Sequence, residues 1–260
     1  MNKTKIDNPS YDIVLIGAGN LGQHLAWAID QSSRLNLLTI FLRNPEKIKG
    51  LPKVPISTSL EELPQADLYI LAVNDSQISK LAQNPFFQDK FIVHLSGATP
   101  LEVFPMKRAG ILYFLYSFSK GSTTNFKEIP ASIETKHLED QHLLKTIAEQ
   151  FCSHVSVMSS KKRGELHMAA VFANNFTNFM LIEAQEICQA HDLNFKLLEP
   201  LVLQGVHKAF EIGPENAQTG PAIRNDQATL QRHEAKLSSD KRELYKILTK
   251  AIQDKYGKKL

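Results

Sequence analysis

The stretch Asp12-Ile-Val-Leu-Ile-Gly17-Ala-Gly19-Asn-Leu-Gly22 decides the fold of this chain. Its run of branched apolar residues is typical of a strand that a parallel sheet buries on both faces. The three glycines have the spacing G-x-G-x-x-G, and a helix is expected next, over residues 21–29. Gly17 would allow a tight turn, Gly19 a close approach of the backbone to a pyrophosphate, and Gly22 close packing of the helix on the strand.

The start of this helix is the expected binding site for the phosphates of a dinucleotide. Its first N–H groups have no partner within the helix, and the helix dipole favours negative charge there. We therefore expect Asn20 and Leu21 to contact the cofactor together with the three glycines. A glycine-rich turn with a purely structural role is the alternative, because such turns also occur without a ligand.

An arginine follows the second predicted strand, residues 37–42. The residue at this strand end contacts the adenosine ribose: a carboxylate accepts bonds from the ribose hydroxyls of NAD, and an arginine accommodates the 2′-phosphate of NADP. Arg43 lies 21 residues after Gly22, and no acidic residue takes its place. The sequence therefore favours NADP(H) as the cofactor. Alternatively, Arg43 is a solvated residue at the end of the strand and has no role in binding.

Strands and helices alternate up to residue 160, which predicts an α/β fold with a doubly wound, mainly parallel sheet. Strands are expected over residues 54–57, 67–73, 91–95, 111–118, 129–134 and 154–158, a helical turn over 59–62, and helices from residue 76 and over 138–151. The polar segment 116–121 either faces the substrate or is a surface loop.

Two loops of this sheet are expected to line the cofactor site. Ligands bind beyond the carboxyl ends of parallel strands, where Val73, Asn74 and Ser96 are located. Ordinary turn chemistry explains the same residue types equally well. His94 lies inside an apolar strand, so we expect it to be packed in the core and not catalytic.

Strand signals stop beyond residue 160. Helices are expected over residues 165–190, 196–211, 227–238 and 240–256. This pattern predicts a Rossmann NADP(H)-binding domain over residues 1–160 and an all-helical substrate or dimerisation domain over residues 161–260.

The first of these helices carries an unusual polar stripe. At about 100° per residue, His167, Asn174 and Asn178 would lie on one side of it. Asparagine is a poor helix former on a solvent-exposed face, so the stripe suggests a cleft between the domains. There His167 would exchange a proton, since the ordinary pKa of histidine lies near neutrality, and the two amides would orient the substrate. A buried polar network between helices is the alternative.

A later loop, Thr219-Gly-Pro-Ala-Ile-Arg-Asn-Asp226, is the second candidate for substrate binding. Thr219 and Arg224 would donate hydrogen bonds to an anionic substrate. Alternatively, Asp226 caps the following helix and Arg224 is its ion-pair partner.

Two motifs give the chain a family resemblance. Leu166-His-Met-Ala-Ala-Val-Phe-Ala-Asn-Asn-Phe-Thr-Asn178 and Thr219-Gly-Pro-Ala-Ile-Arg224 resemble a bacterial family of Rossmann-like proteins with a C-terminal helical domain of unknown function. The family falls within the NADP oxidoreductases similar to pyrroline-5-carboxylate reductase and 6-phosphogluconate dehydrogenase. The resemblance implies a nucleotide-binding domain, a helical domain that often mediates dimers, and an NADP-linked redox role with an unassigned substrate. Hydroxyacid enzymes of this group have a lysine four residues before an asparagine of the interdomain helix. Neither Asn174 nor Asn178 has one, which argues against that chemistry.

Composition narrows the possible partners and the cellular compartment of the protein. The chain is 43% apolar and 22% charged, as in ordinary globular proteins, and its net charge of +3 does not indicate a nucleic-acid partner. It has no stretch of ~18 uninterrupted apolar residues for a membrane span, and its first ten residues are too polar for a signal peptide. Cys152 and Cys188 form no C-x-x-C motif and are expected to be reduced thiols. We therefore expect a cytoplasmic homodimer with a small-molecule substrate and no metal. It is either an NADP(H)-dependent oxidoreductase or a non-catalytic NADP(H)-binding sensor.

Overall fold

A computed structural model of the chain describes residues 10–121 and 124–257. The chain divides into two compact units, Met1–Ala173 and Asn174–Leu260. The first is an α/β unit and the second is helical.

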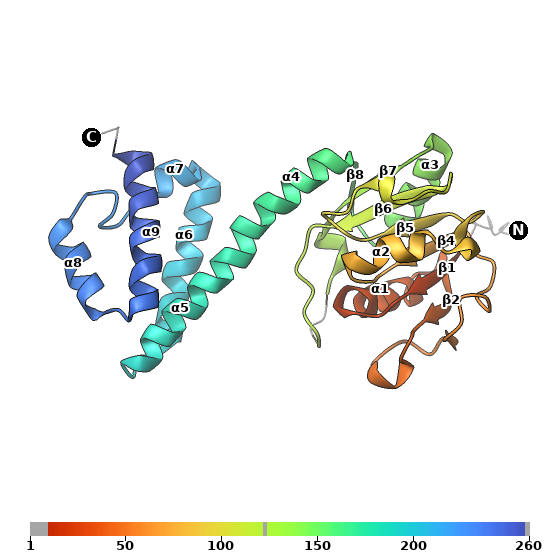
Figure 1. Cartoon of the computed structure of the whole chain (residues 1–260), viewed down its shortest axis with the longest axis horizontal. Coiled ribbons are helices and arrows are strands. Elements are labelled where there is room, and N and C mark those ends of the chain that lie inside the picture. Colours follow the sequence, from red (N-terminus) through yellow and green to blue (C-terminus); the bar gives the residue numbers. More distant parts are fainter. Residues whose placement is uncertain (1–9, 122–123, 258–260) are drawn as a thin grey trace, which may run out of the picture. The chain divides into compact units, whose positions relative to one another are not determined.

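The described part of the first unit contains an eight-stranded sheet with the order β3-β2-β1-β4-β5-β6-β7-β8 (Figure 1). The strands β1 to β6 run parallel, β7 is antiparallel to β6, and β8 is parallel to β7. This arrangement confirms the predicted doubly wound, mainly parallel sheet. The strands are β1 (Tyr11–Ile16), β2 (Leu35–Phe41), β3 (Ile56–Ser57), β4 (Leu68–Leu71), β5 (Ile92–His94), β6 (Ala109–Phe114), β7 (Pro130–Thr135) and β8 (His154–Val157).

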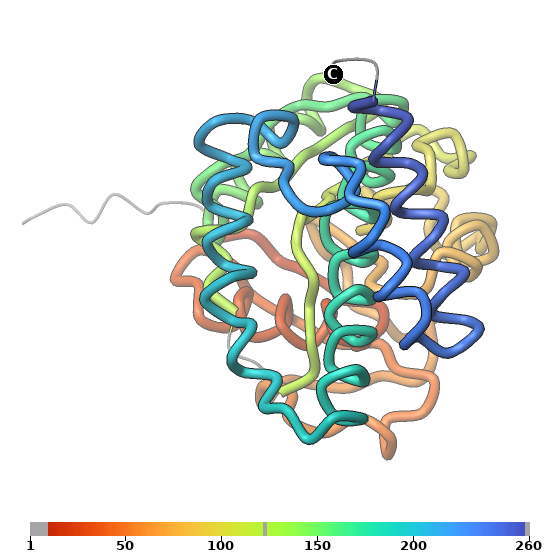
Figure 2. The backbone as a smooth tube through the Cα atoms, turned by 90° about the vertical axis from the view of Figure 1, so that its left-hand side faces the viewer, coloured from red at the N-terminus to blue at the C-terminus, as the bar shows by residue number. Residues whose placement is uncertain are grey.

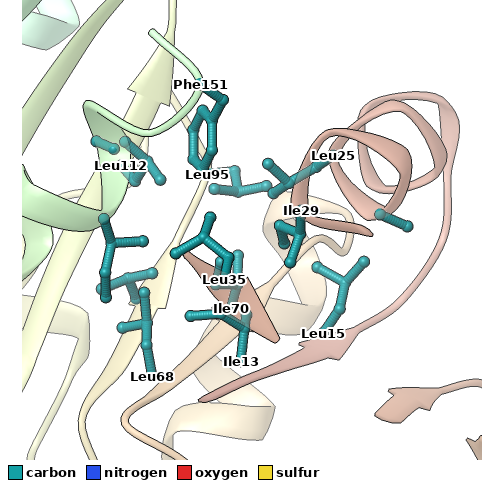
Figure 3. Close-up of a cluster of buried hydrophobic side chains, with 14 of the residues drawn as sticks. Ile13, Leu15, Leu25, Ile29, Leu35, Leu68, Ile70, Leu95, Leu112 and Phe151 are labelled. Carbon is teal, nitrogen blue, oxygen red and sulfur yellow. The ribbon is translucent and has the colours of Figure 1, made fainter. Parts of the chain in front are cut away.

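Both faces of the sheet are buried, as the apolar run of β1 predicts. Side chains alternate along a strand, so Ile13 and Leu15 belong to one hydrophobic cluster and Val14 and Ile16 to the other. In the first cluster, Leu25 and Ile29 project from α1 toward the strand residues (Figure 3). The helices of this unit are α1 (Asn20–Asp30), α2 (Asp75–Ala82), α3 (Leu138–Ala148) and α4 (Ser160–Ala170).

The second unit consists of helices and turns in its described part. Its helices are α5 (Thr177–Ala190), α6 (Glu199–Ile212), α7 (Pro214–Ala217), α8 (Gln227–Lys236) and α9 (Ser239–Tyr256). α8 and α9 lie side by side in both backbone views (Figures 1 and 2). In the part of the chain that the structure describes, no helix combines the length and the hydropathy needed to cross a bilayer.

Two local predictions in the first unit are wrong. Residues 59–62 form a turn instead of a helical turn. Here the Ser57 hydroxyl accepts from the N–H of Ser59 at 3.1 Å and donates to its carbonyl at 2.8 Å, and such local bonds compete with a helix. The strand expected over residues 111–118 ends at Phe114, because the N–H of Tyr116 turns back to the Phe114 carbonyl at 2.9 Å.

The α-helix expected over residues 165–190 is also interrupted. A π-helix occupies Val171–Phe176, between α4 and α5. Its hydrogen bonds span five residues, so the rotation of about 100° per residue does not apply to it. The stripe of His167, Asn174 and Asn178 therefore does not follow from an α-helical register.

Candidate functional site

Two glycines of the G-x-G-x-x-G turn are required by the protein itself. Gly17 has φ +94°, and a methyl group on it would lie 2.5 Å from the Ala72 carbonyl oxygen of the neighbouring strand end. A methyl group on Gly22 would lie 2.9 Å from the Gly17 carbonyl oxygen. The turn and the close approach of α1 to the sheet thus account for both residues, whether or not a ligand binds.

Gly19 has no such structural reason. Its φ is −65°, and a methyl group there would meet no atom within 4 Å. It is exposed and precedes α1, whose N-terminus has no side-chain cap. The N–H groups at the start of this helix, those of Asn20 and Leu21 included, have no partner within the helix. Open space before such groups fits the pyrophosphate of a dinucleotide, so the residues present suit this cofactor class.

The loop after β6 lies against α1. The Asn20 side-chain amide donates to the Phe118 carbonyl at 3.3 Å, and Nε2 of His24 lies 2.9 Å from the Ser119 carbonyl oxygen. The Asn20 side chain is thus engaged, which leaves its backbone N–H as the group that is available to a ligand.

Arg43 lies at the same edge of the sheet as the glycine turn. Gly17 donates its N–H to the carbonyl of Phe41 at 2.9 Å, and Arg43 follows two residues later. Its side chain is exposed and makes no ion pair or hydrogen bond with a described residue. The guanidinium is thus free to bind an anion, which is the state that the 2′-phosphate role requires.

The loops after β4 and β5 are tied to one another. The Ser96 hydroxyl donates to Oδ2 of Asp75 at 2.8 Å and accepts from the N–H groups of Ala98 and Thr99 at 3.1 and 2.9 Å. This hydroxyl therefore holds the loops together. The N–H of Ser96 is bound to His94, so its carbonyl is the backbone group left for a cofactor. Val73 lies beside the glycine turn, with Cγ1 2.9 Å from a methyl group placed on Gly17, and Asn74 is exposed at the start of α2.

His94 is fully buried, as expected of a packed histidine. Its ring stacks on Phe104 with centroids 5.4 Å apart, and its Nδ1 accepts from the N–H of Ser96 at 3.2 Å. This bond assigns the ring proton to Nε2. Burial lowers the pKa of His94 to about 4, with a contribution from the positive charge of Arg163. A neutral His94 therefore supports the loop that carries Ser96 and Gly97.

His167 contacts this loop and the end of β6. Its Nδ1 lies 3.2 Å from the hydroxyl of Tyr113, and the two rings meet edge to face with centroids 5.9 Å apart. A methyl group on Gly97 would lie 2.6 Å from Nδ1 of His167 and 2.8 Å from Cε2 of Tyr113. Glycine at this position therefore makes room for the pair. Burial raises the pKa of Tyr113, so its hydroxyl keeps its proton.

A buried ion pair holds α4 one turn before His167. The guanidinium of Arg163 is 1% exposed and donates to Oε2 of Glu134 at 2.8 Å and to the Thr99 carbonyl at 2.7 Å. Ser160 donates to the same carboxylate oxygen at 2.6 Å. The four residues from Arg163 to His167 rise about 6 Å along the helix. The two residues from Ile111, which pairs with Glu134, to Tyr113 advance about 6.6 Å along β6. The spacing of the two contacts along α4 thus matches their spacing along the strands. The ion pair and the His167–Tyr113 contact therefore align the same helix with the sheet.

The remaining predicted residues belong to the second unit. Asn174, Asn178, Thr219 and Arg224 are all exposed. Asp226 caps α8 by accepting from the N–H of Thr229 at 3.1 Å, and hydrogen bonds from Thr229 lower its pKa. Arg224 forms no ion pair with it among the described residues, so only half of that alternative is correct. The substrate roles of the four exposed residues stay predictions.

Two residues of the site in the first unit were not predicted from the sequence. Tyr113 is a polar aromatic residue near the carboxyl end of an apolar strand, and this position could have indicated it. Arg163 precedes His167 by four residues, which places both on one face of α4. Gly97 belongs to the loop after β5 that was expected to line the cofactor site, but its contact with the pair has no signal in the local sequence.

Comparisons with known proteins agree with this architecture. Residues 129–252 match the model of the domain of unknown function DUF2520. A crystal structure of the "putative NADP oxidoreductase BF3122" from Bacteroides fragilis is 34% identical, covers 94% of this chain and 98% of its own, and has a TM-score of 0.86. A search of curated proteins finds no match.

Two more distant structures show the same fold. An imine reductase from Myxococcus stipitatus in complex with NADP+ is 15% identical, with 95% of this chain and 92% of its own covered and a TM-score of 0.63. The pyrroline carboxylate reductase of Plasmodium falciparum with NADP bound is 14% identical, with 95% and 98% covered and a TM-score of 0.58. The identity over nearly the whole length of both chains shows that this chain belongs to the family of the Bacteroides fragilis protein, and residues 129–252 carry the DUF2520 domain.

Proposed function

We propose that the chain is an NADP(H)-dependent oxidoreductase that transfers a hydride to or from a small anionic substrate. The observation that carries the proposal is the open space at Gly19 before the uncapped start of α1. The Bacteroides fragilis relative is named as an NADP oxidoreductase, and the imine and pyrroline carboxylate reductase structures hold NADP+ and NADP.

The first unit carries the cofactor in this proposal. The turn of Gly17, Gly19 and Gly22 and the N–H groups of Asn20 and Leu21 bind the pyrophosphate. The free guanidinium of Arg43 binds the 2′-phosphate. Val73, Asn74 and the backbone carbonyl of Ser96 line the path toward the nicotinamide. When bound, the nicotinamide supplies or accepts the hydride.

His167 moves the proton that accompanies this transfer. In this proposal Nδ1 keeps its proton and donates to the Tyr113 oxygen, so Nε2 is the atom that exchanges a proton with the substrate. The imidazolium form gives its Nε2 proton to a substrate that is being reduced and becomes neutral, and the neutral ring takes a proton on Nε2 from a substrate that is being oxidised. Tyr113 thus holds one tautomer of the neutral ring, and glycine at position 97 leaves room for the pair.

The second unit completes the proposal on the substrate side. Asn174 and Asn178 orient the substrate, and Thr219 and Arg224 bind its anionic group. In this assignment residues 1–160 are the cofactor domain and residues 161–260 the substrate and dimerisation domain.

A homodimer is part of the same proposal, because the second unit has almost no core of its own. Within its described residues the buried apolar side chains are Cys188, Ala222 and Leu230. Large apolar side chains are exposed instead, with Phe210 at 89% and Leu197 at 73%. Helices with such faces need a partner surface, and closed homodimers are the commonest way to supply one.

Cofactor choice is tested by binding of NADPH and NADH to the wild type and to Arg43→Asp. Loss of a charge-assisted phosphate contact, about 1.5–3 kcal/mol, should weaken NADPH about 10- to 100-fold and leave NADH nearly unchanged. Lys53→Asp makes the same change from a positive to a negative charge at an exposed site ten residues later in the chain and is the control. Equal loss of both cofactors in Arg43→Asp, or no binding by the wild type, would contradict the assignment.

Catalysis is tested by the oxidation of NADPH in the presence of small carboxylates that carry a carbonyl or imine group. His167→Gln should abolish turnover and leave NADPH affinity within about twofold. Undiminished turnover would remove His167 from the mechanism. Tight NADPH binding without turnover across the panel would favour the non-catalytic sensor.

The dimer is tested by sedimentation velocity at micromolar concentration. We expect a dimer for the wild type and a monomer for Phe210→Glu. Leu138 is 73% exposed in the first unit, so Leu138→Glu adds the same charge and should leave the dimer intact. A monomeric wild type would refute the dimer.

A further inference from the structure

We propose that the outer side of α1 binds a second ligand, an aromatic anion of about the size of a nucleoside monophosphate. A cavity of about 750 Å³ lies there, between α1, the loop around Lys49 and the segments near Lys120 and Lys127. This volume is within the range of roughly 300–1,000 Å³ that is usual for small-molecule sites.

The charge of the lining selects an anion. Lys49, Lys120 and Lys127 all line the cavity, and none of the described residues around it is Asp or Glu. Lys127 donates to the carbonyls of Glu149 and Gln150 at the end of α3. Lys49 and Lys120 make no ion pair or hydrogen bond with a described residue, so their ammonium groups are free for a ligand. Three cations in a lining without a described carboxylate favour a phosphate or carboxylate ligand.

An aromatic wall and a buried hydroxyl complete the site. Trp27 lines the cavity, is 42% exposed, and donates Nε1 to the Gly50 carbonyl at 2.7 Å. The bond fixes the indole and leaves a face of it for stacking with a planar ring. Thr124 also lines the cavity, and its hydroxyl oxygen is buried with no hydrogen-bond partner in the described structure. A polar ligand that enters beside this residue would supply the missing partner.

This cavity differs from the proposed cofactor site. Of the residues assigned to the cofactor, only Asn20 lines it. Gly17, Arg43 and Ser96 are not among its lining residues. Occupancy is therefore independent of the proposed oxidoreductase function, although Asn20 at the start of α1 borders both sites.

The single tryptophan of the chain makes the site directly observable. We expect AMP to change the fluorescence of Trp27 saturably, more strongly than adenosine or inorganic phosphate, because AMP carries both ring and charge. The response should weaken as salt rises, since the lysines are exposed. It should persist with NADP+ present at saturation. Displacement of AMP by NADP+, or no saturable response, would overturn the proposal.

Matched charge reversals identify the residues. Lys49→Glu combined with Lys120→Glu should weaken AMP at least about tenfold, because two attractions become repulsions. Lys47→Glu combined with Lys53→Glu makes the same charge change outside the cavity and should bind as the wild type does. Equal weakening in both variants would show a general charge effect and overturn the site. A chain that binds AMP in this way but fails to bind NADPH would refute the proposed function alone.

Discussion

The hydroxyl of Tyr113 lies 3.2 Å from Nδ1 of His167, although 54 residues separate them in the chain. The strand β6 supplies the tyrosine and α4 the histidine, and a methyl group on Gly97 would lie only 2.6 Å from the imidazole. The hydrogen bond at one ring nitrogen of a histidine sets the role of the other nitrogen. Variants of Tyr113, Gly97 and Arg163 distinguish this contact from the general stability of the fold.

Tyr113→Phe removes the hydroxyl and keeps the ring packing. If the hydroxyl selects the tautomer of His167, turnover should fall about 10- to 100-fold, the range of a lost orienting contact. NADPH affinity and melting temperature should change little. Nitrogen-15 NMR of the imidazole in the wild type and Tyr113→Phe measures the tautomer ratio without any substrate. An unchanged ratio would rule out the orienting role.

Gly97→Ala tests the space around the pair. The added methyl group would lie 2.6 Å from Nδ1 of His167, so the ring must move away from Tyr113. Overpacking of this kind costs about 1–3 kcal/mol of the free energy of unfolding and should also lower turnover. Gly164→Ala is the matched control on α4: its methyl group meets no atom within 4 Å, and alanine in a helix stabilises by up to about 1 kcal/mol. Wild-type turnover in Gly97→Ala would show that the ring position is not critical.

The ion pair of Arg163 and Glu134 should behave as a coupled unit. Arg163→Met leaves the Glu134 carboxylate without its partner, and breaking a buried pair costs about 3–5 kcal/mol of the free energy of unfolding. Adding Glu134→Gln removes the stranded charge and should restore part of that loss. Urea unfolding of both single variants and the double variant gives the coupling energy. Purely additive losses would contradict the network.

The sequence predicted those parts of the fold that depend on local patterns. The apolar run of β1 and the spacing of Gly17, Gly19 and Gly22 depend on residues within one strand and one turn, so their reading needs no tertiary information. The same holds for the alternation of strands and helices that identified the doubly wound sheet. Arg43 could be proposed as a cofactor residue because its distance from the glycine turn is set by one helix and one strand.

The sequence could not show features that depend on longer-range packing. A pattern of apolar residues does not reveal the π-helix at Val171–Phe176. Because of this π-helix, a rotation of about 100° per residue no longer places His167, Asn174 and Asn178 on one side of a helix. Ser96 was expected near the cofactor, but its hydroxyl is bound to Asp75, which only the pairing of β4 beside β5 brings close. Tyr113 and Arg163 were missed for the same reason, since their partners come from other elements.

The burial of His94 predicts how the free energy of unfolding depends on pH. Its pKa is about 4 in the folded protein, below the 6.5 of an exposed histidine, so folding favours the neutral ring. The unfolded chain therefore binds a proton first as pH falls, and the stabilisation from His94 is lost between about pH 6.5 and pH 4. At 1.36 kcal/mol per pKa unit, the loss is on the order of 3 kcal/mol.

The variant His94→Asn isolates this contribution. Its side-chain oxygen can replace Nδ1 as the acceptor for the N–H of Ser96, but it does not titrate. Urea unfolding at pH 7 and at pH 4.5 should show a smaller loss of stability for His94→Asn than for the wild type, whatever the variant costs at pH 7. His154→Asn removes an exposed histidine of β8 and is the control. Equal losses in the wild type and His94→Asn would mean that the buried ring is not the titrating group.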